Sequence, residues 1–376
     1  MSGRKRALHL ILLLGLVSLL GDMVYEGVRG VAGPFLASLG ASAAVVGAVS
    51  GLGEFLGYGL RPLSGYLSDR WGGYWGLTFL GYLALLSLPL LCLTDSWRLA
   101  VLLLLLERMG KAVRTPPRDA MLSHATSQVG RGWGFGIHEA LDQVGAVAGP
   151  LLMALLISLR GYRGAFSCLF LPALLLLLFL AMGWRLYPRP SLLETGGEGG
   201  RVRGGFRLYL LFVVLSTSGF LTFPLLAYRL TSSFSDAEIP LLYALAMGTD
   251  ALLALWAGRS YDRRGLSSLL LVPLLSLPIA PLAFLVGGKG GGLLAVVLWG
   301  ASMGVQETVM RAAVGEMAPG GKRGTAYGLF SSLYGFSGFA GNTLMGLLYS
   351  SPGMVVAFSL SAELLSLPVL LRLRGR

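Results

Sequence analysis

The chain of 376 residues is 55% hydrophobic and only 13% charged, with a mean hydropathy of +0.72. A soluble domain of this length cannot bury so much apolar surface, so the composition excludes a soluble globular protein and predicts that the excess faces lipid. The formal net charge of +12 does not indicate nucleic-acid binding, because the basic residues stand between long apolar stretches.

The apolar stretches predict about twelve membrane-spanning helices, since one crossing needs roughly 20 mostly apolar residues. In chain order the expected spans are 8–36, 42–66, 75–95, 98–117, 132–159, 162–184, 207–230, 238–258, 267–286, 291–314, 324–349 and 352–371. The first is basic and then apolar, like a signal peptide. It has no small-residue cleavage site and its apolar run continues past residue 30, so we expect it to be retained as a span.

The basic residues between the spans predict the orientation of the chain. If the spans alternate, one side of the membrane holds Arg4, Lys5, Arg6, Arg70, Arg118, Arg131, Arg185, Arg189, Arg201, Arg203, Arg207, Arg259, Arg263, Arg264, Lys322, Arg323, Arg372, Arg374 and Arg376. The other side holds Arg98, Arg160, Arg163, Arg229 and Lys289. By the positive-inside rule, we expect a multi-pass protein of the cell (inner or plasma) membrane with both termini cytoplasmic.

Two short motifs show that the chain repeats itself. GYLSDRWGGY at 65–74 matches GRSYDRRG at 258–265 with an offset of 193 residues, and RGWGFG at 131–136 matches RGTAYG at 323–328 with an offset of 192. Such a repeat predicts two copies of one structural unit, as in many secondary transporters. We expect an N-terminal six-helix bundle at 1–184, a cytoplasmic linker at 185–206 and a C-terminal six-helix bundle at 207–376.

The repeated motif carries Gly65, Asp69 and Arg70 in the first copy, and Asp262 and Arg263 in the second. We expect it in the short loop after spans two and eight. Gly permits a sharp turn, the Asp interacts with amide groups at the N-terminus of the next helix, and the Arg bridges to a neighbouring helix. These contacts would form a cytoplasmic gate; the simpler alternative is that the motif only shapes a tight turn.

GYLSDRWGGY resembles the loop motif of the major facilitator superfamily between spans two and three, and GRSYDRRG resembles its degenerate copy between spans eight and nine. The superfamily prefers a basic residue where Gly73 and Tyr74 stand. The resemblance covers the whole chain. It implies an all-α polytopic fold of 12 transmembrane helices in two pseudo-symmetric six-helix bundles, with a central cavity, alternating access and a monomeric state.

Two further segments resemble parts of the superfamily. ERMGKAVRTPPRDAML at 107–122 is similar to the span-four region of a largely uncharacterised, efflux-like prokaryotic branch, and Arg108 stands where the superfamily often keeps an intramembrane Arg. GAVAGP at 145–150 resembles the span-five pattern associated with antiporters, although Met153 and Ala154 replace its usual second Gly pair. Apart from the resemblance, the residue types alone predict close helix packing at GAVAGP and a helix break at Pro116-Pro117.

Charges inside the expected spans are candidate functional groups, because each costs roughly 2.5–3.5 kcal/mol at the bilayer centre. In the first half they are Asp22, Glu26, Arg29, Glu54, Arg108, His138, Glu139 and Asp142. Helical spacing places Asp22, Glu26 and Arg29 on one stripe, and His138 and Asp142 on one face. We expect these residues to line a proton-coupling or substrate cavity, with Glu54 as a partner for Arg29 or Arg108.

Structural alternatives remain open for the same residues. Glu26 and Arg29 form an ion pair in the simpler interpretation, Asp142 pairs with an Arg of span four, and His138 is a satisfied core residue. The basic residues at the lower end of span four could meet lipid headgroups. The second half offers fewer charges, and its candidate cavity residues are Asp250, Glu307, Arg311, Tyr327, Tyr334 and Asn342.

These observations predict a secondary active transporter that exports a small organic molecule by proton-coupled antiport, and not an enzyme. Alternatives are an exporter of a divalent metal such as iron or zinc, and a lipid or lysolipid flippase. The expected partners are a small-molecule substrate, protons as coupling ion and the lipid bilayer, without nucleic acid. We expect no cofactor, no catalytic residue and no bound metal. The chain has no Walker sequence, and Cys92 and Cys168 form no disulfide framework.

Overall fold

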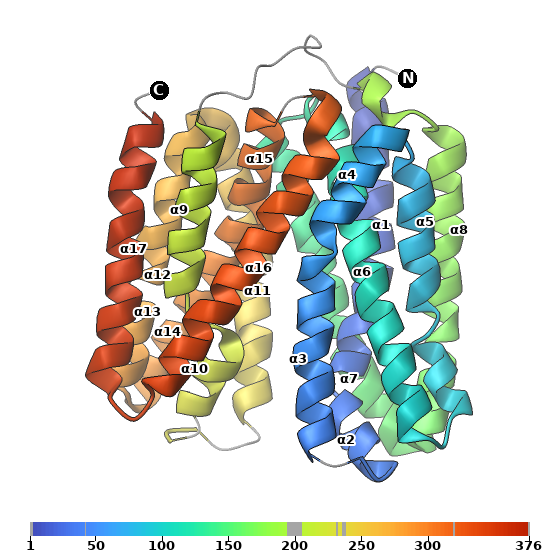
Figure 1. Ribbon diagram of the computed structural model, residues 1–376, viewed down its shortest axis with the longest axis horizontal. Helices are drawn as coiled ribbons and strands as arrows, with labels where there is room; N and C mark the ends of the chain where they lie inside the picture. Colours follow the sequence, from blue (N-terminus) through green and yellow to red (C-terminus); the bar gives the residue numbers. More distant parts are fainter. Residues whose placement is uncertain are drawn as a thin grey trace. The chain divides into compact units, whose positions relative to one another are not determined.

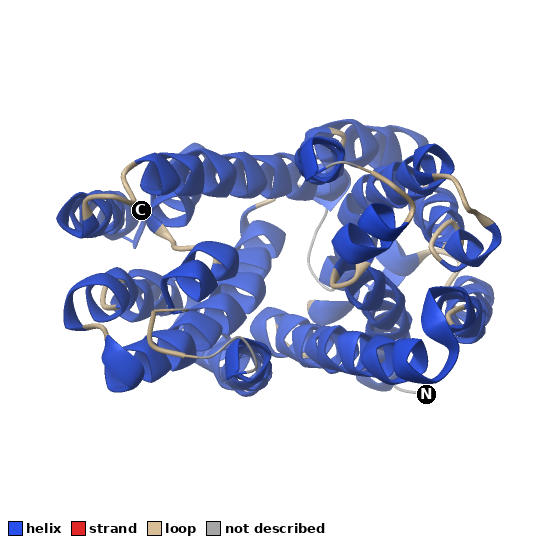
Figure 2. Cartoon of the chain, turned by 90° about the horizontal axis from the view of Figure 1, so that it is seen from below, coloured by secondary structure: helices blue, strands red, loops and turns tan. Residues whose placement is uncertain are grey.

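The computed structural model describes residues 3–41, 43–193, 205–230, 232–234, 238–318 and 320–374. All regular secondary structure in these residues is helical (Figures 1 and 2). Half of the expected linker at 185–206 falls outside the described residues, which omit 194–204.

Close contacts divide the chain into two compact units. The first comprises Met1–Val129, Leu141–Gly196 and Gly321–Ser332, and the second comprises Gly130–Ala140, Gly197–Gly320 and Leu333–Arg376. Two long helices, α7 (Arg131–Cys168) and α16 (Arg323–Leu347), therefore contribute residues to both units.

The other helices of the first unit are α1 (Gly3–Arg29), α2 (Ala32–Ser38), α3 (Ala43–Gly59), α4 (Arg61–Trp71), α5 (Tyr74–Leu85), η1 (Pro89–Leu93), α6 (Trp97–Thr126), α8 (Phe170–Leu186) and η2 (Pro190–Leu193). Those of the second unit are α9 (Phe206–Gly219), α10 (Phe223–Leu230), α11 (Glu238–Arg264), η3 (Gly265–Leu270), α12 (Leu271–Ser276), α13 (Ile279–Pro281), η4 (Leu282–Val286), α14 (Gly288–Val305), η5 (Gln306–Met310), α15 (Arg311–Met317) and α17 (Pro352–Arg374). The short helix η6 (Gly320–Lys322) has Gly320 in the second unit and its other two residues in the first.

The twelve expected spans all fall on these helices. Seven helical runs among the described residues are long and apolar enough to cross a membrane, and two of them, Arg131–Leu186 and Leu241–Val286, reach 56 and 46 residues, enough for two crossings each. Helix α6 lies outside these seven runs, and its charges from Glu107 to Asp119 explain why hydropathy alone does not mark it.

Two local predictions about helix ends are wrong. Pro116 and Pro117 do not break the span-four helix, because α6 runs through them to Thr126. A proline at 116 leaves the carbonyl oxygen of Ala112 without its usual helical donor, and the Ser64 hydroxyl donates to that oxygen at 2.9 Å. The expected break between spans five and six, after residue 159, is present at Gly161, whose φ of 64° interrupts α7.

The second wrong prediction concerns the repeated motif. Asp69 and Arg70 lie in the last turn of α4, and Asp262 and Arg263 lie in the last turn of α11, rather than in the loops. The turns that follow are made by glycines with positive φ, Gly72 and Gly265. The helices therefore continue about one turn further than the sequence suggests.

Close packing of α1 against α7 confirms the prediction for the GAVAGP segment. A Cβ added at Gly145 would collide with the carbonyl oxygen of Leu19, and one at Gly149 would collide with that of Met23. Two helix backbones can approach this closely only where the side chain is a hydrogen atom.

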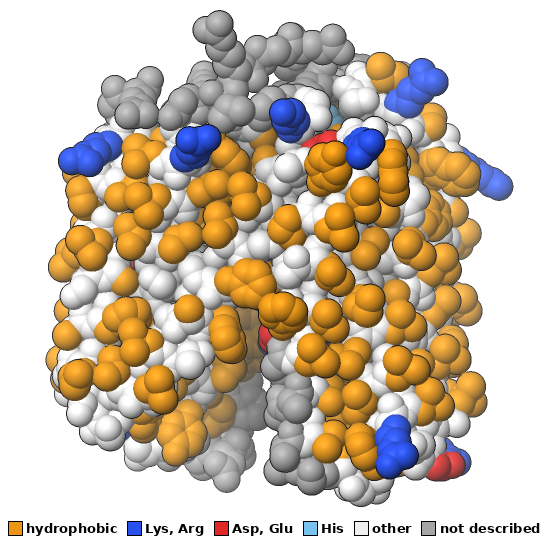
Figure 3. All heavy atoms as spheres, viewed as in Figure 1, with side chains coloured by type: hydrophobic (Ala, Val, Ile, Leu, Met, Phe, Trp, Pro, Cys, Tyr) orange, Lys and Arg blue, Asp and Glu red, His pale blue; other side chains and the backbone are white. Residues whose placement is uncertain are grey.

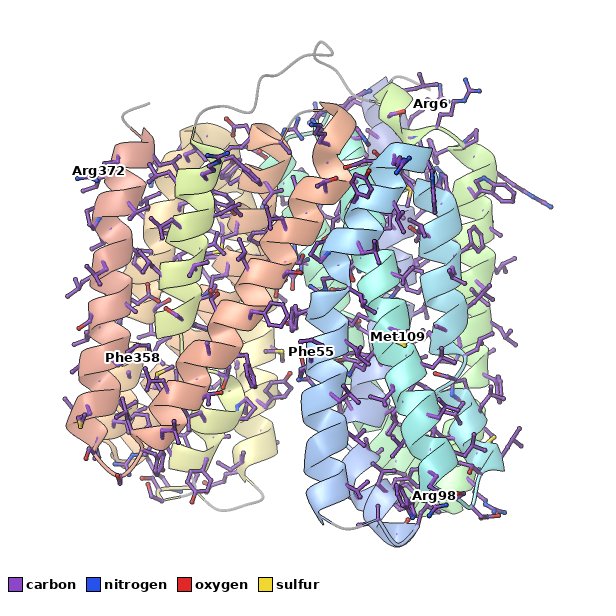
Figure 4. All side chains as sticks on the ribbon, in the orientation of Figure 1. Arg6, Phe55, Arg98, Met109, Phe358 and Arg372 are labelled. Carbon is purple, nitrogen blue, oxygen red and sulfur yellow. The ribbon has the colours of Figure 1, made fainter. Side chains whose placement is uncertain are left out.

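The exposed surface of both units is largely apolar, as expected for lipid-facing helices. Leu171 and Leu174 of α8 are 67% and 56% exposed, and Leu365 of α17 is 59% exposed. Figure 3 shows hydrophobic side chains spread over the helices, with Lys and Arg at the helix ends. In the first unit, Arg6 and Arg98 lie at opposite ends of the helices (Figure 4).

The substitution Gly149→Ala tests the glycine contact. We expect it to lower the free energy of unfolding by about 1–3 kcal/mol, because the methyl group must push α1 away from α7. Thermal or denaturant unfolding of the purified chain in detergent measures this change. The matched control is Gly76→Ala on α5, where an added Cβ meets nothing within 4 Å and stability should stay the same or rise slightly. Equal destabilisation by both substitutions would contradict the interpretation.

Candidate functional site

The charged stripe of α1 lies beside charges of α3 and α6 in the first unit. The Arg29 guanidinium lies 3.3 Å from Glu26 and 3.6 Å from Glu54, and Arg108 lies 3.3 Å from the same Glu54 oxygen. Glu54 therefore joins two arginines from different helices, so the expected partnership with Arg29 or Arg108 holds for both. The Glu26–Arg29 ion pair is also present.

Tyr25, next to this stripe, is surrounded by cations. Arg108 donates a hydrogen bond to the Tyr25 hydroxyl, and its Cζ lies 4.8 Å from the ring centroid. The Nζ of Lys111 lies 3.7 Å from the same centroid and the Cζ of Arg29 lies 5.9 Å from it. The negative face of an aromatic ring attracts cations, so Tyr25 helps to hold three positive side chains close together.

Asp22 stands one turn before Glu26 on α1 and is partly buried. Its electrostatic neighbours are Asp142, Lys111, Glu26 and Arg118. Three carboxylates thus gather around two cations. Arg118 is shared further, because its Nη2 lies 3.0 Å from Asp119 and its Nη1 donates to the Ser18 hydroxyl at 2.9 Å.

The basic end of α6 is held by the protein rather than by lipid headgroups. Arg114 and Arg118 are 3% and 7% exposed. Arg114 lies 3.2 Å from Glu107, which is 1% exposed, and stacks over the Tyr82 ring. Arg118 also interacts electrostatically with Asp142, which agrees with the alternative that pairs Asp142 with an Arg of span four.

The other predicted charges of span five belong to the second unit. Glu139, only 2% exposed, lies 3.1 Å from Arg311, and Arg311 also pairs with Glu307 one turn earlier. Glu307 and Arg311, which stand four residues apart in the sequence, therefore form an ion pair, with a carboxylate from α7 added to it. His138 is completely buried on α7 beside Glu139. The structure thus groups Asp22, Glu26 and Asp142 in one unit, and His138 and Glu139 in the other.

The remaining second-half candidates have different surroundings. Asn342 donates to the carbonyl oxygens of Phe220 and Gly338 and accepts from the amide of Thr222, so it holds the break between α9 and α10. Asp250 is completely buried on α11. Tyr334 donates to Gln306 Oε1 at 3.2 Å. Tyr327 is completely buried and is grouped with the first unit.

The structure reveals polar residues that the sequence did not single out. Glu363 of α17 is fully buried, and Gln306 begins the short π-helix η5. Glu363 is the one charged residue in the apolar run of α17 before Arg372, which is the signal that marks an intramembrane polar residue, whereas Gln306 directly precedes Glu307. Among the described residues, no three His, Cys, Asp or Glu side chains come together as a metal site.

Asp69 binds the N-terminus of a helix that is distant in sequence. Its carboxylate accepts hydrogen bonds from the amides of Gly324 and Thr325 at 2.8 and 2.7 Å and from the Thr325 hydroxyl at 2.7 Å. The expectation that Asp69 caps the next helix, α5, is therefore wrong: that helix supplies only the Tyr74 hydroxyl, which donates to Asp69 at 3.0 Å. Gly72, with its positive φ, ends α4 and turns the chain, and the last side chains of α4 then contact α16.

Asp262 repeats this contact in the second unit. It accepts hydrogen bonds from the amides of Gly132 and Trp133 at the start of α7, both at 2.8 Å. Arg70 donates to Tyr66 on its own helix at 3.3 Å and so does not make the expected bridge to a neighbouring helix.

Glycines allow both helix ends to approach. A Cβ at Gly65 would collide with the Gly324 carbonyl oxygen, and a Cβ at Gly132 would collide with that of Gly258. Gly65 and Gly258 are equivalent in the sequence repeat, as are Gly132 and Gly324, with offsets of 193 and 192 residues. The repeated sequence therefore builds the same contact in each unit.

Comparison with known proteins gives these features a context. The family model of the Major Facilitator Superfamily matches residues 11–341. An uncharacterized protein of Mycobacterium tuberculosis (strain ATCC 25618 / H37Rv) is 40% identical over 386 residues, covering 98% of this chain and 93% of the relative.

Two solved structures share the fold at low sequence identity. The human organic anion transporter MFSD10 is 18% identical with a TM-score of 0.74, covering 99% of this chain and 100% of the other. A bacterial homologue of the iron transporter ferroportin, in the outward-facing state, is 22% identical with a TM-score of 0.69, covering 98% and 100%. At these identities the likeness shows the fold of twelve transmembrane helices in two six-helix bundles. The chain belongs to the Major Facilitator Superfamily, and it is therefore a membrane transporter and not an enzyme.

Proposed function

We propose that the protein is a secondary active transporter that exports a small organic molecule in exchange for protons, by alternating access. We place it in a cell membrane with both termini cytoplasmic, because of the positive-inside bias of the sequence. We propose a monomer, as the superfamily resemblance implies. Asp22 is the proposed proton site, and Glu26, Asp142 and Lys111 complete its surroundings. The proposed domain boundaries remain those of the sequence repeat, with a linker at 185–206.

The observation that carries this proposal is the sharing of cations around Asp22. Asp22 interacts with Lys111 and Arg118; Lys111 also interacts with Glu26, and Arg118 also interacts with Asp142 and binds Asp119. A proton on Asp22 removes one negative charge from this group and weakens its hold on the cations. Loading and release of one proton therefore changes the charge balance of α1, α6 and α7 together. A transporter needs such a change to favour one conformation over another.

The substitution Asp22→Asn tests proton coupling. Proteoliposomes are loaded with a candidate solute and the pH dye pyranine, and are placed in an acidic bath. We expect solute-dependent acidification of the lumen in the wild type, and only the rate of protein-free liposomes in Asp22→Asn, because the amide cannot bind the coupling proton. The solutes are p-toluenesulfonate, tetraethylammonium and xylose, which represent an anion, a cation and a neutral molecule.

The control for this experiment is Glu238→Gln, which removes an exposed carboxylate paired with Lys289 and should leave acidification unchanged. Solute-dependent acidification by Asp22→Asn at the wild-type rate would contradict proton coupling through Asp22. Solute efflux without acidification in the wild type would contradict antiport altogether.

The cations around Tyr25 favour a second candidate, a flippase for an anionic lipid or lysolipid. The side chains of Arg29, Arg108 and Lys111 all lie close to the Tyr25 ring, and such a group of cations can bind a phosphate. Fluorescent lysophosphatidylglycerol in the same proteoliposomes separates the candidates. Faster transfer of this lipid between leaflets, with no response to the three solutes, would favour the flippase. No contact in the described part of the chain favours the metal exporter.

We also propose that the Asp69 and Asp262 contacts form the cytoplasmic gate, with Gly65, Arg70 and Arg263 shaping the same helix ends. Each aspartate holds two amide groups at a helix N-terminus, where a negative charge is favourable. A contact of this kind is strong enough to hold one conformation and weak enough to break during transport, since a helix cap contributes about 1 kcal/mol.

The substitutions Asp69→Ala and Asp262→Ala test these contacts by hydrogen exchange. Loss of about 1 kcal/mol should raise the exchange rate roughly fivefold in peptides at the affected helix start. Asp69→Ala should act on 323–328 and Asp262→Ala on 131–136, each leaving the other peptide unchanged. Glu238→Gln is the control and should change neither peptide, because this carboxylate pairs with Lys289 and contacts neither helix start. If both peptides exchange as in the wild type, the two carboxylates do not stabilise the helix ends.

A further inference from the structure

Glu363 is a buried acid in the second unit, on the membrane-spanning helix α17. Its side chain has no exposed surface. The Ser216 hydroxyl of α9 donates to Glu363 Oε2 at 3.1 Å, and the Ser276 hydroxyl of α12 lies beside the carboxyl group. The other oxygen, Oε1, has no hydrogen-bonding partner of good geometry among the described residues. A buried acceptor in this position calls for a donor or a bound ion.

Among the described residues, the helices packed against α17 place no buried cation near Glu363 to balance a negative charge. The helices packed against α17 are α9, α12, α13, η3 and η4, and Arg207 at the exposed start of α9 is the single charged residue in them. On α17 itself the nearest described basic side chain is Arg372, nine residues further along, or roughly 13 Å of helix. The groups within reach of the acid are serine hydroxyls.

These hydroxyls begin a hydrogen-bonded chain that leads away from Glu363. Ser276 Oγ lies 2.7 Å from Ser302 Oγ, and Gln306 Nε2 donates to Ser302 Oγ at 3.1 Å. The Tyr334 hydroxyl donates to Gln306 Oε1 at 3.2 Å. Ser276, Ser302 and Gln306 are all buried, whereas Tyr334 is partly exposed. The chain therefore joins the buried acid to the edge of the unit.

We propose that Glu363 is a proton-binding site of the second unit, with the proton on Oε1 donated to the Ser276 hydroxyl, which donates in turn to Ser302. An isolated carboxylate in an apolar interior is far more costly than the neutral acid. The acid O–H supplies the donor that Oε1 lacks, and Ser302 Oγ has two lone pairs with which to accept from both Ser276 and Gln306. The site is separate from Asp22, so the outcome for Asp22→Asn does not decide it.

Infrared spectroscopy of the purified full-length chain tests the bound proton. A protonated carboxyl group has a C=O band that shifts in D2O, and the wild-type spectrum minus that of Glu363→Gln isolates the contribution of Glu363. We expect a positive carboxyl band in this difference. Ser216→Ala should move the same band without removing it, because it deletes one hydrogen bond to the carbonyl oxygen. Glu238→Gln, which changes an exposed ion-paired acid, is the control and should leave the band unchanged.

Two results would overturn the proton site. One is a difference spectrum without a carboxyl band, which means that Glu363 is ionised. The other is a band that is present in choline chloride and lost in sodium chloride, which means that a sodium ion occupies the place of the proton. Both are read from the wild type and Glu363→Gln in the same buffers.

Ser276→Ala tests the hydroxyl that accepts the proton of Glu363. We expect the Glu363 carboxyl band to move from its wild-type position, because the acid O–H loses its acceptor. Tyr209→Phe is the matched control, because its hydroxyl donates to the Met310 carbonyl oxygen outside the chain, and its band should stay at the wild-type position. A band at the wild-type position in Ser276→Ala would overturn the assigned acceptor.

Discussion

The cost of a charge inside the hydrocarbon determines most of the polar structure of this protein. Each intramembrane charge must find a partner within the helices, because lipid offers none. In the first unit the partners are opposite charges: Glu107 with Arg114, Arg118 with Asp119, and Glu54 with two arginines. Some of these charges have one close ionic partner, as Glu107 has in Arg114, whereas Arg118 is shared among Asp119, Asp142 and Asp22.

A second constraint acts at the helix ends, where four amide groups have no partner within the helix. Asp69 and Asp262 each satisfy two of them, on α16 and α7 respectively. The glycines of the motif are part of the same arrangement, since a side chain at Gly65 or Gly132 would keep the helices apart. This explains why the motif contains both residue types: the glycine permits the approach and the aspartate makes it favourable.

The sequence predicts those features of the structure that depend on local periodicity or on strong apolar composition. Apolar stretches predicted the twelve spans, the Glu26–Arg29 pair was one of two interpretations of its helical spacing, and Glu307 and Arg311 have the same kind of spacing. Local sequence patterns could not predict the contacts between segments that are distant in the chain. The amides that bind Asp69 are about 255 residues away in the chain, and no local pattern names them. The continuity of α6 through Pro116 likewise depends on Ser64, a hydroxyl from another helix.

Single intramembrane polar residues are harder to identify as functional from the sequence than clusters are, and Glu363 shows the reason. A cluster such as the α1 stripe stands out by spacing, whereas a lone acid acquires its role from the hydroxyls that the fold brings to it. The two units therefore handle buried charge differently although they share one motif. Arg118 and Arg311 are equivalent in the repeat, and each is held by a nearby acid, Asp119 or Glu307. Beyond that pair the first unit adds further ionised groups, while the second adds Glu139 and then serines, Gln306 and Tyr334. The repeated helix contacts are compatible with both arrangements of buried charge, because they lie at the helix ends and do not involve the charged side chains in the middle of the helices.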